Sequence, residues 1–329
     1  MQVHFINVGY GEAILVTQDD NTILIDGGTN RTEEYEQPGC IRTTDYLKKI
    51  GISKIDLVII THIHDDHIGG IPEVIRNFPV SQVWINVRPD MPDMELIHQF
   101  DSVIKGNLSG ILFRNALESY AELLEECGRR GIPVHQKGKE DGFLSFTEGF
   151  DIELLTPGKQ MQMETRDAYD RLFIEKEIGK AEALFYEIDK LGNSTSISLR
   201  IKAGKTAVLL SGDKVDGWEE IFQEYGSGLE SQILKVTHHG QIDGLPQAMI
   251  EVAQPEIFVI CSSADKRFNS AHPAVIDRAH IFLQEKRKNG GVYITGCLGA
   301  EMEVEKEICG VCFLCDVTTG KIEAHFHEC

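Results

Sequence analysis

The stretch Thr61–Gly70, THIHDDHIGG, places three histidines and two aspartates between positions 62 and 67. It follows residues 54–61, KIDLVIIT, a mostly apolar run typical of a strand buried on both faces. The segment that comes next, GGIPEVIRNF, predicts a helix with Pro72 in its first turn. So many imidazoles and carboxylates where a buried strand meets a helix are costly unless they bind something.

The spacing His-x-His-x-Asp-His predicts a metal site. His62 and His64 are two residues apart, so both imidazoles can point to the same side of the loop. Asp66 and His67 fall at the start of the helix and can face a neighbouring position. Neutral imidazole and carboxylate ligands suit Zn²⁺, and also Mn²⁺ or Fe. We expect one or two ions here, whereas a polar turn with accidental histidines would not explain the spacing.

Two aspartates at other strand ends complete the expected centre. Asp213 ends TAVLLSGD, directly after an apolar strand and a glycine, and a carboxylate there could bridge two ions. Asp26 ends TILID in the same way, and could hold a ligand histidine from behind. Each of them alone would be interpreted as a turn aspartate.

Further candidates lie downstream. ILKVTHHG ends in the pair His238 and His239, and we assign His238 as a ligand or proton donor. His272 in NSAHP is a second candidate for proton donation. The basic residues Lys266 and Arg267 precede it and could bind a phosphate group of the substrate.

Composition limits the partners. The chain has 329 residues, with 52 acidic against 32 basic side chains and a formal net charge of −20. This balance argues against a long nucleic acid, because such binders place Lys and Arg against phosphates. A small anionic substrate remains compatible, since salt screens charges beyond about 8 Å. Oligomeric state is not predicted.

No secretory leader is apparent, and the longest apolar runs, such as AVLL, are far shorter than the roughly 18 residues of a membrane span. The eight cysteines show no evenly spaced framework, which fits a reducing compartment. We expect a soluble, cytoplasmic protein without a membrane partner.

The segment CGVCFLC, with Cys309, Cys312 and Cys315, precedes His325 and His327 and invites a zinc-knuckle interpretation. The paired Cys-x-x-Cys elements of a structural zinc site are missing. A β-hairpin with buried cysteines is therefore favoured, and these cysteines receive no assigned role.

Strands cluster in both halves of the chain, with helices between them. This pattern predicts two βα halves packed into one α/β sandwich with helices outside, as a single domain over 1–329. We expect a helical insertion at about 90–131 and a charged, helix-compatible insertion at about 159–191. The alternating EMEVEKEI at 301–308 suits a strand with a solvated acidic face.

Seven motifs appear in an order that resembles one family: INVGYGEAILV, TILIDGG, THIHDDHIGG, NSTSISLRI, LLSGD, KVTHHG and AHP. They resemble the metallo-β-lactamase-fold hydrolases, most of all the soluble hydrolase domain of ComEC-type competence proteins. The resemblance implies a metallo-β-lactamase-like αβ/βα four-layer sandwich, with metals at one edge between the sheets.

The sequence departs from that family at two positions. Asn193, Ser194 and Ser196 stand where the superfamily usually has a further histidine ligand, which puts full double occupancy in question. His64 stands where the ComEC-like branch often has aspartate. We place Asn193 and Ser194, like Asp26, among the residues that support the ligands.

These features predict a metal-dependent hydrolase that works through metal-bound hydroxide, which Asp66 would orient. The expected substrate is a phosphoester, above all a phosphodiester such as a nucleotide or short oligonucleotide. One alternative is a carboxylic ester, lactone or thioester hydrolase, which would have an apolar pocket without Lys266 and Arg267. The other is a non-catalytic, metal-stabilised binding protein.

Overall fold

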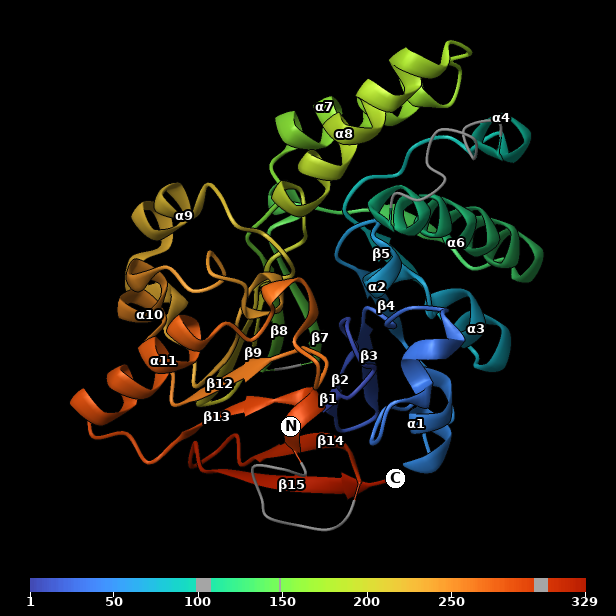
Figure 1. Ribbon diagram of the computed structural model, residues 1–329. Coiled ribbons are helices and arrows are strands. Elements are labelled where there is room, and N and C mark those ends of the chain that lie inside the picture. The colour runs from blue at the N-terminus through green and yellow to red at the C-terminus, as the bar shows by residue number, and fades with distance from the viewer. Residues whose placement is uncertain (99–107, 148, 299–306) are drawn as a thin grey trace.

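The computed structural model describes the chain from Met1 to Cys329 except residues 99–107, 148 and 299–306, and its described strands form two mixed sheets (Figure 1). The first sheet has the order β15-β14-β1-β2-β3-β4-β5-β6. Its strands are β1 (Gln2–Ile6), β2 (Ile14–Gln18), β3 (Asn21–Ile25), β4 (Leu57–Ile60), β5 (Val83–Ile85), β6 (Val134–Gln136), β14 (Ile308–Cys315) and β15 (Ile322–Glu328). The strands from β3 to β6 run parallel, while β15, β14, β1, β2 and β3 pair antiparallel.

The second sheet has the order β13-β12-β11-β10-β9-β8-β7. Its strands are β7 (Phe143–Thr147), β8 (Phe150–Leu154), β9 (Leu199–Ala203), β10 (Thr206–Leu210), β11 (Ile233–Lys235), β12 (Ile257–Ile260) and β13 (Gly291–Ile294). The strands β10 to β13 are parallel, so their carboxyl ends meet at one edge.

The two sheets pack face to face over one core that both supply, including Val3 and Ile59 from the first sheet and Ile197, Val208 and Val259 from the second half of the chain. Helices cover both outer faces: α1 (Thr43–Lys49), α3 (Ile71–Asn77) and α6 (Leu108–Arg130) on one side, and α9 (Trp218–Tyr225), α10 (Gln247–Ala253) and α11 (Pro273–Glu285) on the other (Figure 1). Coverage on both faces explains the continuous apolar runs of β4 and β10. The expected αβ/βα sandwich is confirmed.

The remaining helices are α2 (Asp65–Ile68), α4 (Met94–His98), α7 (Lys159–Leu172) and α8 (Ile178–Ser194). Single 3-10 turns lie at Thr32–Glu36, Lys139–Asp141, Gly226–Leu229, His238–Gly240, Arg267–Asn269 and Thr295–Cys297. The charged segment around 159–191 is helical as expected, but it also packs inward. The ring centroid of Phe113 in α6 lies 6.3 Å from that of Tyr169 in α7 and 4.7 Å from that of Phe185 in α8. Both α7 and α8 therefore pack against α6.

Part of the helix expected at 90–131 and most of the acidic strand expected at 301–308 lie outside the described residues. The C-terminal hairpin is present, as β14 and β15. Its cysteines do not converge, since Cys315 lies in the core between the sheets and Cys309 in a separate cluster with Tyr46. Among the helices that the structure describes, none is long and apolar enough to cross a membrane.

Candidate metal centre

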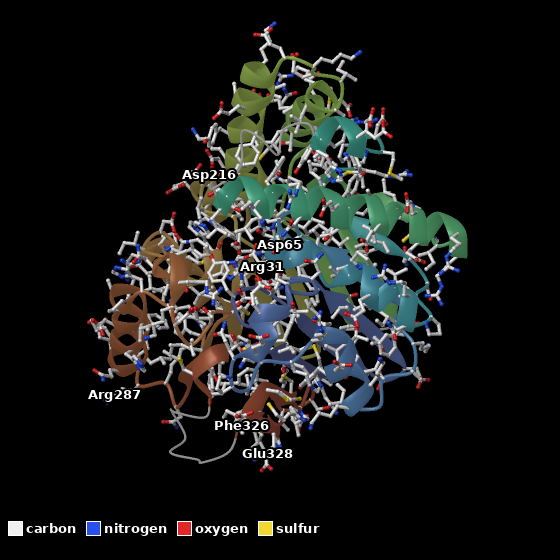
Figure 2. The ribbon with its side chains drawn as sticks, turned by 45° about the vertical axis from the view of Figure 1, so that its right-hand side comes forward. Arg31, Asp65, Asp216, Arg287, Phe326 and Glu328 are labelled. Atoms are coloured by element: carbon white, nitrogen blue, oxygen red, sulfur yellow. The ribbon has the colours of Figure 1, made fainter. Side chains whose placement is uncertain are left out.

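The centre lies where several parallel strands end. The loop after β4 carries His62 and His64, and α2 follows at Asp65. Asp213 follows β10 from the other sheet, and His239 follows β11. Strand ends are where α/β folds place ligand sites. Figure 2 shows Asp65 where the N-terminal half, in blue, meets the C-terminal half, in orange.

Four of these side chains converge on one point. The ligand atoms of Asp66, His67, Asp213 and His239 lie within 4.8 Å of one another. The Nε2 atom of His239 is 2.9 Å from Asp66 Oδ2 and 3.0 Å from Asp213 Oδ2, and His67 Nε2 is 3.3 Å from Asp213 Oδ2. The two imidazole Nε2 atoms are 3.4 Å apart.

Burial and charge oppose each other in this group. Burial works against a charged His239, but the carboxylates of Asp213 and Asp66 outweigh it and raise the pKa of His239 to about 9. Burial likewise disfavours a charged Asp66, yet the histidines His67 and His239 lower its pKa to about 2. Both directions reflect the attraction between the carboxylates and a positive charge beside them.

The outer nitrogens of the same histidines are already engaged. Nδ1 of His239 lies 2.8 Å from the Cys261 carbonyl oxygen, which can only accept, so this nitrogen carries the proton. Nδ1 of His67 lies 2.7 Å from Asp26 Oδ2. Histidine ligands are held in this way, with the second nitrogen donating to a carbonyl or carboxylate. The four residues therefore fit a divalent ion.

Asp26 also anchors the loop itself. Its carboxylate accepts from the Thr61 backbone N–H at 2.8 Å and from the Thr61 hydroxyl at 2.6 Å. Asp26 has a φ of +56°, unusual for a residue other than glycine, directly after β3. It thus supports His67 from behind the cluster.

His62 and His64 form a second set beside the first. Their ring centroids are 4.4 Å apart, and within the described part of the chain neither Nε2 atom has a hydrogen-bond partner although both are buried. Burial and the neighbouring imidazole of His67 keep the pKa of His62 well below its usual range, so its lone pair is free for a cation. A buried nitrogen without a partner costs about 1–3 kcal/mol. These two histidines therefore fit a second ion.

The ligand position that the sequence assigned to His238 is filled by His239. Both residues have left-handed backbone angles, with φ of +51° and +50°. His239 turns inward, whereas Nδ1 of His238 lies 3.1 Å from Asp243 Oδ1 and its Nε2 lies 3.3 Å from Asn193 Nδ2. Which member of a His-His pair points inward depends on this turn, which the pattern HHG does not reveal.

Ser194 and His272 serve other parts of the fold. The Ser194 hydroxyl donates to Asp216 Oδ2 at 2.8 Å, away from the cluster. His272 caps α11, where its Nδ1 accepts from the Ala274 backbone N–H at 3.1 Å. Capping engages only the Nδ1 of His272.

The basic pair is also engaged or displaced from the cluster. Arg267 pairs with Asp265 at 2.8 Å and contacts Glu34, and Lys266 is exposed. Two carboxylates therefore already neutralise the guanidinium that was expected to meet a phosphate.

A cleft of about 410 Å³ opens onto the cluster. Its lining combines carboxylates, amides and aromatic rings: Tyr10, His64, Asp65, Asp66, Ser109, Leu112, Phe113, Asp189, Asn193, Asp213, His238, Gln241, Phe268 and Asn269. No Lys or Arg is among these described lining residues.

A buried ion pair beneath the cluster was not expected from the sequence. Lys235 Nζ contacts Glu12, lies 3.3 Å from Asp213 Oδ1 and donates to the Gly212 carbonyl at 2.8 Å. The side chains of Glu12 and Lys235 are 0% exposed. Charged residues inside the apolar runs GEAILV and ILKV were the available signal, because a buried charge needs a partner. Gly11 belongs to the same region, since a Cβ there would meet the Asp66 carbonyl oxygen at 2.5 Å.

Fold and site together define a metal-dependent hydrolase with a divalent-metal centre at the edge between two sheets. The model of the metallo-beta-lactamase superfamily matches residues 6–263, and the chain belongs to that superfamily.

The chain is also similar to curated proteins and to solved structures. ComE operon protein 3 of Bacillus subtilis (strain 168) is 21% identical over 306 residues, which cover 88% of this chain and 32% of that protein. Hydroxyacylglutathione hydrolase of Aliivibrio fischeri (strain MJ11) is 35% identical over 70 residues, or 21% of this chain and 23% of that protein. The chain thus matches only about a quarter to a third of the length of these curated relatives. The solved metallo-beta-lactamase fold protein YhfI of Bacillus subtilis aligns with a TM-score of 0.43 at 12% identity, over 89% of this chain and 96% of that one.

Proposed function

We propose that this chain hydrolyses a small phosphoester, above all a phosphodiester such as a nucleotide or short oligonucleotide, with zinc as the metal. One observation carries the proposal: two sets of potential metal-ligand atoms lie side by side at a cleft of about 410 Å³. That volume suits a small-molecule ligand.

We assign Asp66, His67, Asp213 and His239 to one ion. When bound there, such an ion would supply a hydroxide nucleophile at neutral pH and would polarise the scissile ester. Asp66 is the most exposed of the four and lines the cleft, so its carboxylate can accept a hydrogen bond from the attacking water and orient it.

His238 is the proposed proton donor to the leaving group. It lines the cleft, and Asp243, whose Oδ1 lies 3.1 Å from its Nδ1, orients the ring. Its Nε2 lies 3.2 Å from the amide nitrogen of Gln241, another residue of the cleft lining.

The amides of Asn193, Gln241 and Asn269 provide neutral donors for phosphate oxygens around the cleft. Because Arg267 is already paired with carboxylates, recognition of the phosphate would rest on the metal ions and these amides. This arrangement favours a compact anion over a long charged polymer.

A carboxylic ester, lactone or thioester is the second candidate. The described lining has no Lys or Arg, while Tyr10, Leu112, Phe113 and Phe268 offer apolar surface. An uncharged substrate would meet less repulsion from the aspartates of the cleft.

The deciding experiment compares bis-p-nitrophenyl phosphate with p-nitrophenyl acetate, a lactone and a thioester. The protein is purified without added metal, its metal content is measured, and each assay is repeated after chelation. We expect phosphodiester turnover that chelation abolishes and Zn²⁺ or Mn²⁺ restores. Turnover of the carboxylic ester or thioester alone would favour the second candidate. If the folded, metal-loaded protein turned over none of these substrates, the result would favour a non-catalytic, metal-stabilised binding protein.

The second ion needs a ligand beyond His62 and His64, and Asp189 of α8 is in place to provide it. Asp189 Oδ1 lies 3.8 Å from His64 Nε2 and lines the cleft. Asn193, one turn further along α8, holds a buried Oδ1 without a partner among the described residues. We therefore assign the Asp189 carboxylate, with the Asn193 amide beside it, to the second ion.

Asp189→Asn should weaken the affinity for one of the two ions by about 10–100-fold, the range seen when metal sites lose supporting contacts. The measurement is metal stoichiometry and affinity by calorimetry. Glu187→Gln is the control, because it makes the same change on the same helix at a residue that pairs with Arg171 instead. Two ions bound with unchanged affinity in Asp189→Asn would remove Asp189 from the ligand set.

A further inference from the structure

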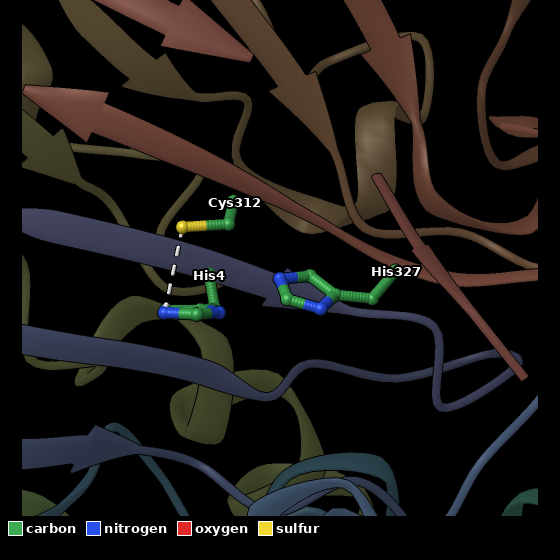
Figure 3. Close-up of side chains that lie close together, drawn as sticks. All are labelled: His4, Cys312 and His327. Atoms are coloured by element: carbon green, nitrogen blue, oxygen red, sulfur yellow. Dashed lines mark hydrogen bonds between the residues drawn. The ribbon is translucent and has the colours of Figure 1, made fainter. Parts of the chain in front are cut away.

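A separate group of metal-ligand side chains lies on the first sheet, away from the hydrolytic centre. His4 of β1, Cys312 of β14 and His327 of β15 offer ligand atoms within 4.8 Å of one another. Figure 3 shows the thiol of Cys312 above the ring of His4, with the ring of His327 beside them. The Sγ atom of Cys312 is 3.5 Å from His4 Nε2, and the rings of His4 and His327 have centroids 5.5 Å apart.

Strand register explains this convergence. His4 lies directly opposite Cys312 in the antiparallel pair of β1 and β14, so both side chains point to the same face. His327 lies opposite Gly310, two residues from Cys312 and hence on that face too. A Cβ at Gly310 would come within 3.1 Å of the Tyr46 ring, so glycine also admits Tyr46 to the site.

The spacing suits a tetrahedral ion. With zinc–nitrogen bonds of about 2.0–2.1 Å and a zinc–sulfur bond of about 2.3 Å, two such ligands stand about 3.5 Å apart. His4 Nδ1 lies 3.0 Å from the Tyr46 hydroxyl, the outer contact that orients a ligating imidazole. Gln2 Oε1 lies 3.3 Å from His4 Nε2 and would give way to the ion.

Burial also suits a bound cation. His4 is 4% exposed and His327 is half-buried, so both rings are held largely away from water beside the buried thiol of Cys312.

We propose that His4, Cys312 and His327 form a metal site separate from the hydrolytic centre, the thiolate site, for a thiophilic divalent cation such as Zn²⁺. Binding forms a sulfur–zinc bond and releases the thiol proton of Cys312 to water, with no change of oxidation state. His4, Cys312 and His327 all line a surface groove of about 450 Å³, together with Lys49 and His325, so an ion could enter from solvent. The bound ion would tie β1 to the β14–β15 hairpin, and this inference does not depend on the hydrolytic activity.

The test is a titration of metal-free protein with Co²⁺, followed by absorption spectroscopy. The hydrolytic centre offers only nitrogen and oxygen ligands, so thiolate-to-cobalt charge transfer does not arise there and reports on the thiolate site. We expect this absorption in the wild type, its loss in Cys312→Ser, and its retention in Cys329→Ser, which removes an exposed thiol next to the same hairpin. Zn²⁺ should abolish the signal by displacing Co²⁺.

If the Cys312→Ser variant does not fold, a second variant changes the half-buried ligand His327. His327→Gln should weaken the Co²⁺ affinity, measured from the thiolate absorption, by at least about tenfold. It should also reduce the rise in melting temperature that Zn²⁺ produces in the wild type, because a ligand bound only to the folded state stabilises it. Absence of thiolate absorption in the wild type, or its persistence in folded Cys312→Ser, would overturn the assignment.

Discussion

Replacing Asp213 with asparagine should lower kcat/KM for a phosphodiester by at least about 1,000-fold, which corresponds to about 4 kcal/mol of lost transition-state stabilisation. Asp213 Oδ2 lies 3.0 Å from His239 Nε2 and 3.3 Å from His67 Nε2, while Oδ1 lies 3.3 Å from Lys235 Nζ. An amide keeps the shape but removes the negative charge that draws a cation to both histidines. Steady-state kinetics and metal analysis on the same sample measure the two effects together.

Asp216→Asn is the matched control, because Asp216 follows Asp213 by three residues but is exposed and contacts Ser194 and Lys214 instead of the histidines. It should retain activity within about threefold of the wild type. If folded Asp213→Asn kept both its metal and its activity, the assignment of this carboxylate to the centre would have to be abandoned.

Lys235→Met should lower the free energy of unfolding of the metal-free protein by about 3–5 kcal/mol, the cost of breaking a buried ion pair by removing one partner. Glu12 and Lys235 are both fully buried, so Glu12 would be left without its neutralising charge. Burial already raises the pKa of the Glu12 carboxyl, and loss of the lysine would drive it to take up a proton. Denaturant unfolding at equilibrium measures the change.

The double variant Glu12→Gln with Lys235→Met separates pairing from packing. It should recover a large part of the lost stability, because no buried charge then lacks a partner. Lys202→Met, at an exposed position of β9, should change stability by less than about 0.5 kcal/mol. The single variant Glu12→Gln is measured as well. If the loss of unfolding free energy in the double variant equalled the sum of the losses in the two single variants, Glu12 and Lys235 would not act as a pair.

Local sequence was sufficient for much of the site. THIHDDHIGG places four ligands within six residues, so chain geometry alone keeps them together. Asp213 and Asp26 could be found because a carboxylate that directly follows a buried strand must emerge at the end of a sheet. The same logic located the HHG turn but could not choose between its two histidines, since that choice depends on two consecutive left-handed residues.

Residues inside elements were harder to interpret. Lys235 and Glu12 are charges within apolar runs, and their pairing joins positions from the two sheets. Asp189 sits in a charged helix that resembles a solvated surface until α8 is packed over His64. Arg267 and His272 had suitable side chains, yet nearby carboxylates and a helix end engage them first.

The sequence by itself therefore determined the superfamily, through the motifs that it shares with that family. It also determined the sandwich of two βα halves and the metal-binding character of the loop after β4, because apolar periodicity and short-range spacing encode these two. Tertiary structure alone decided which distant groups meet: His67 with His239 across 172 positions, and His4 with Cys312 across 308. Side chains so far apart in the chain become neighbours only through strand order and register, which no local pattern of residues specifies.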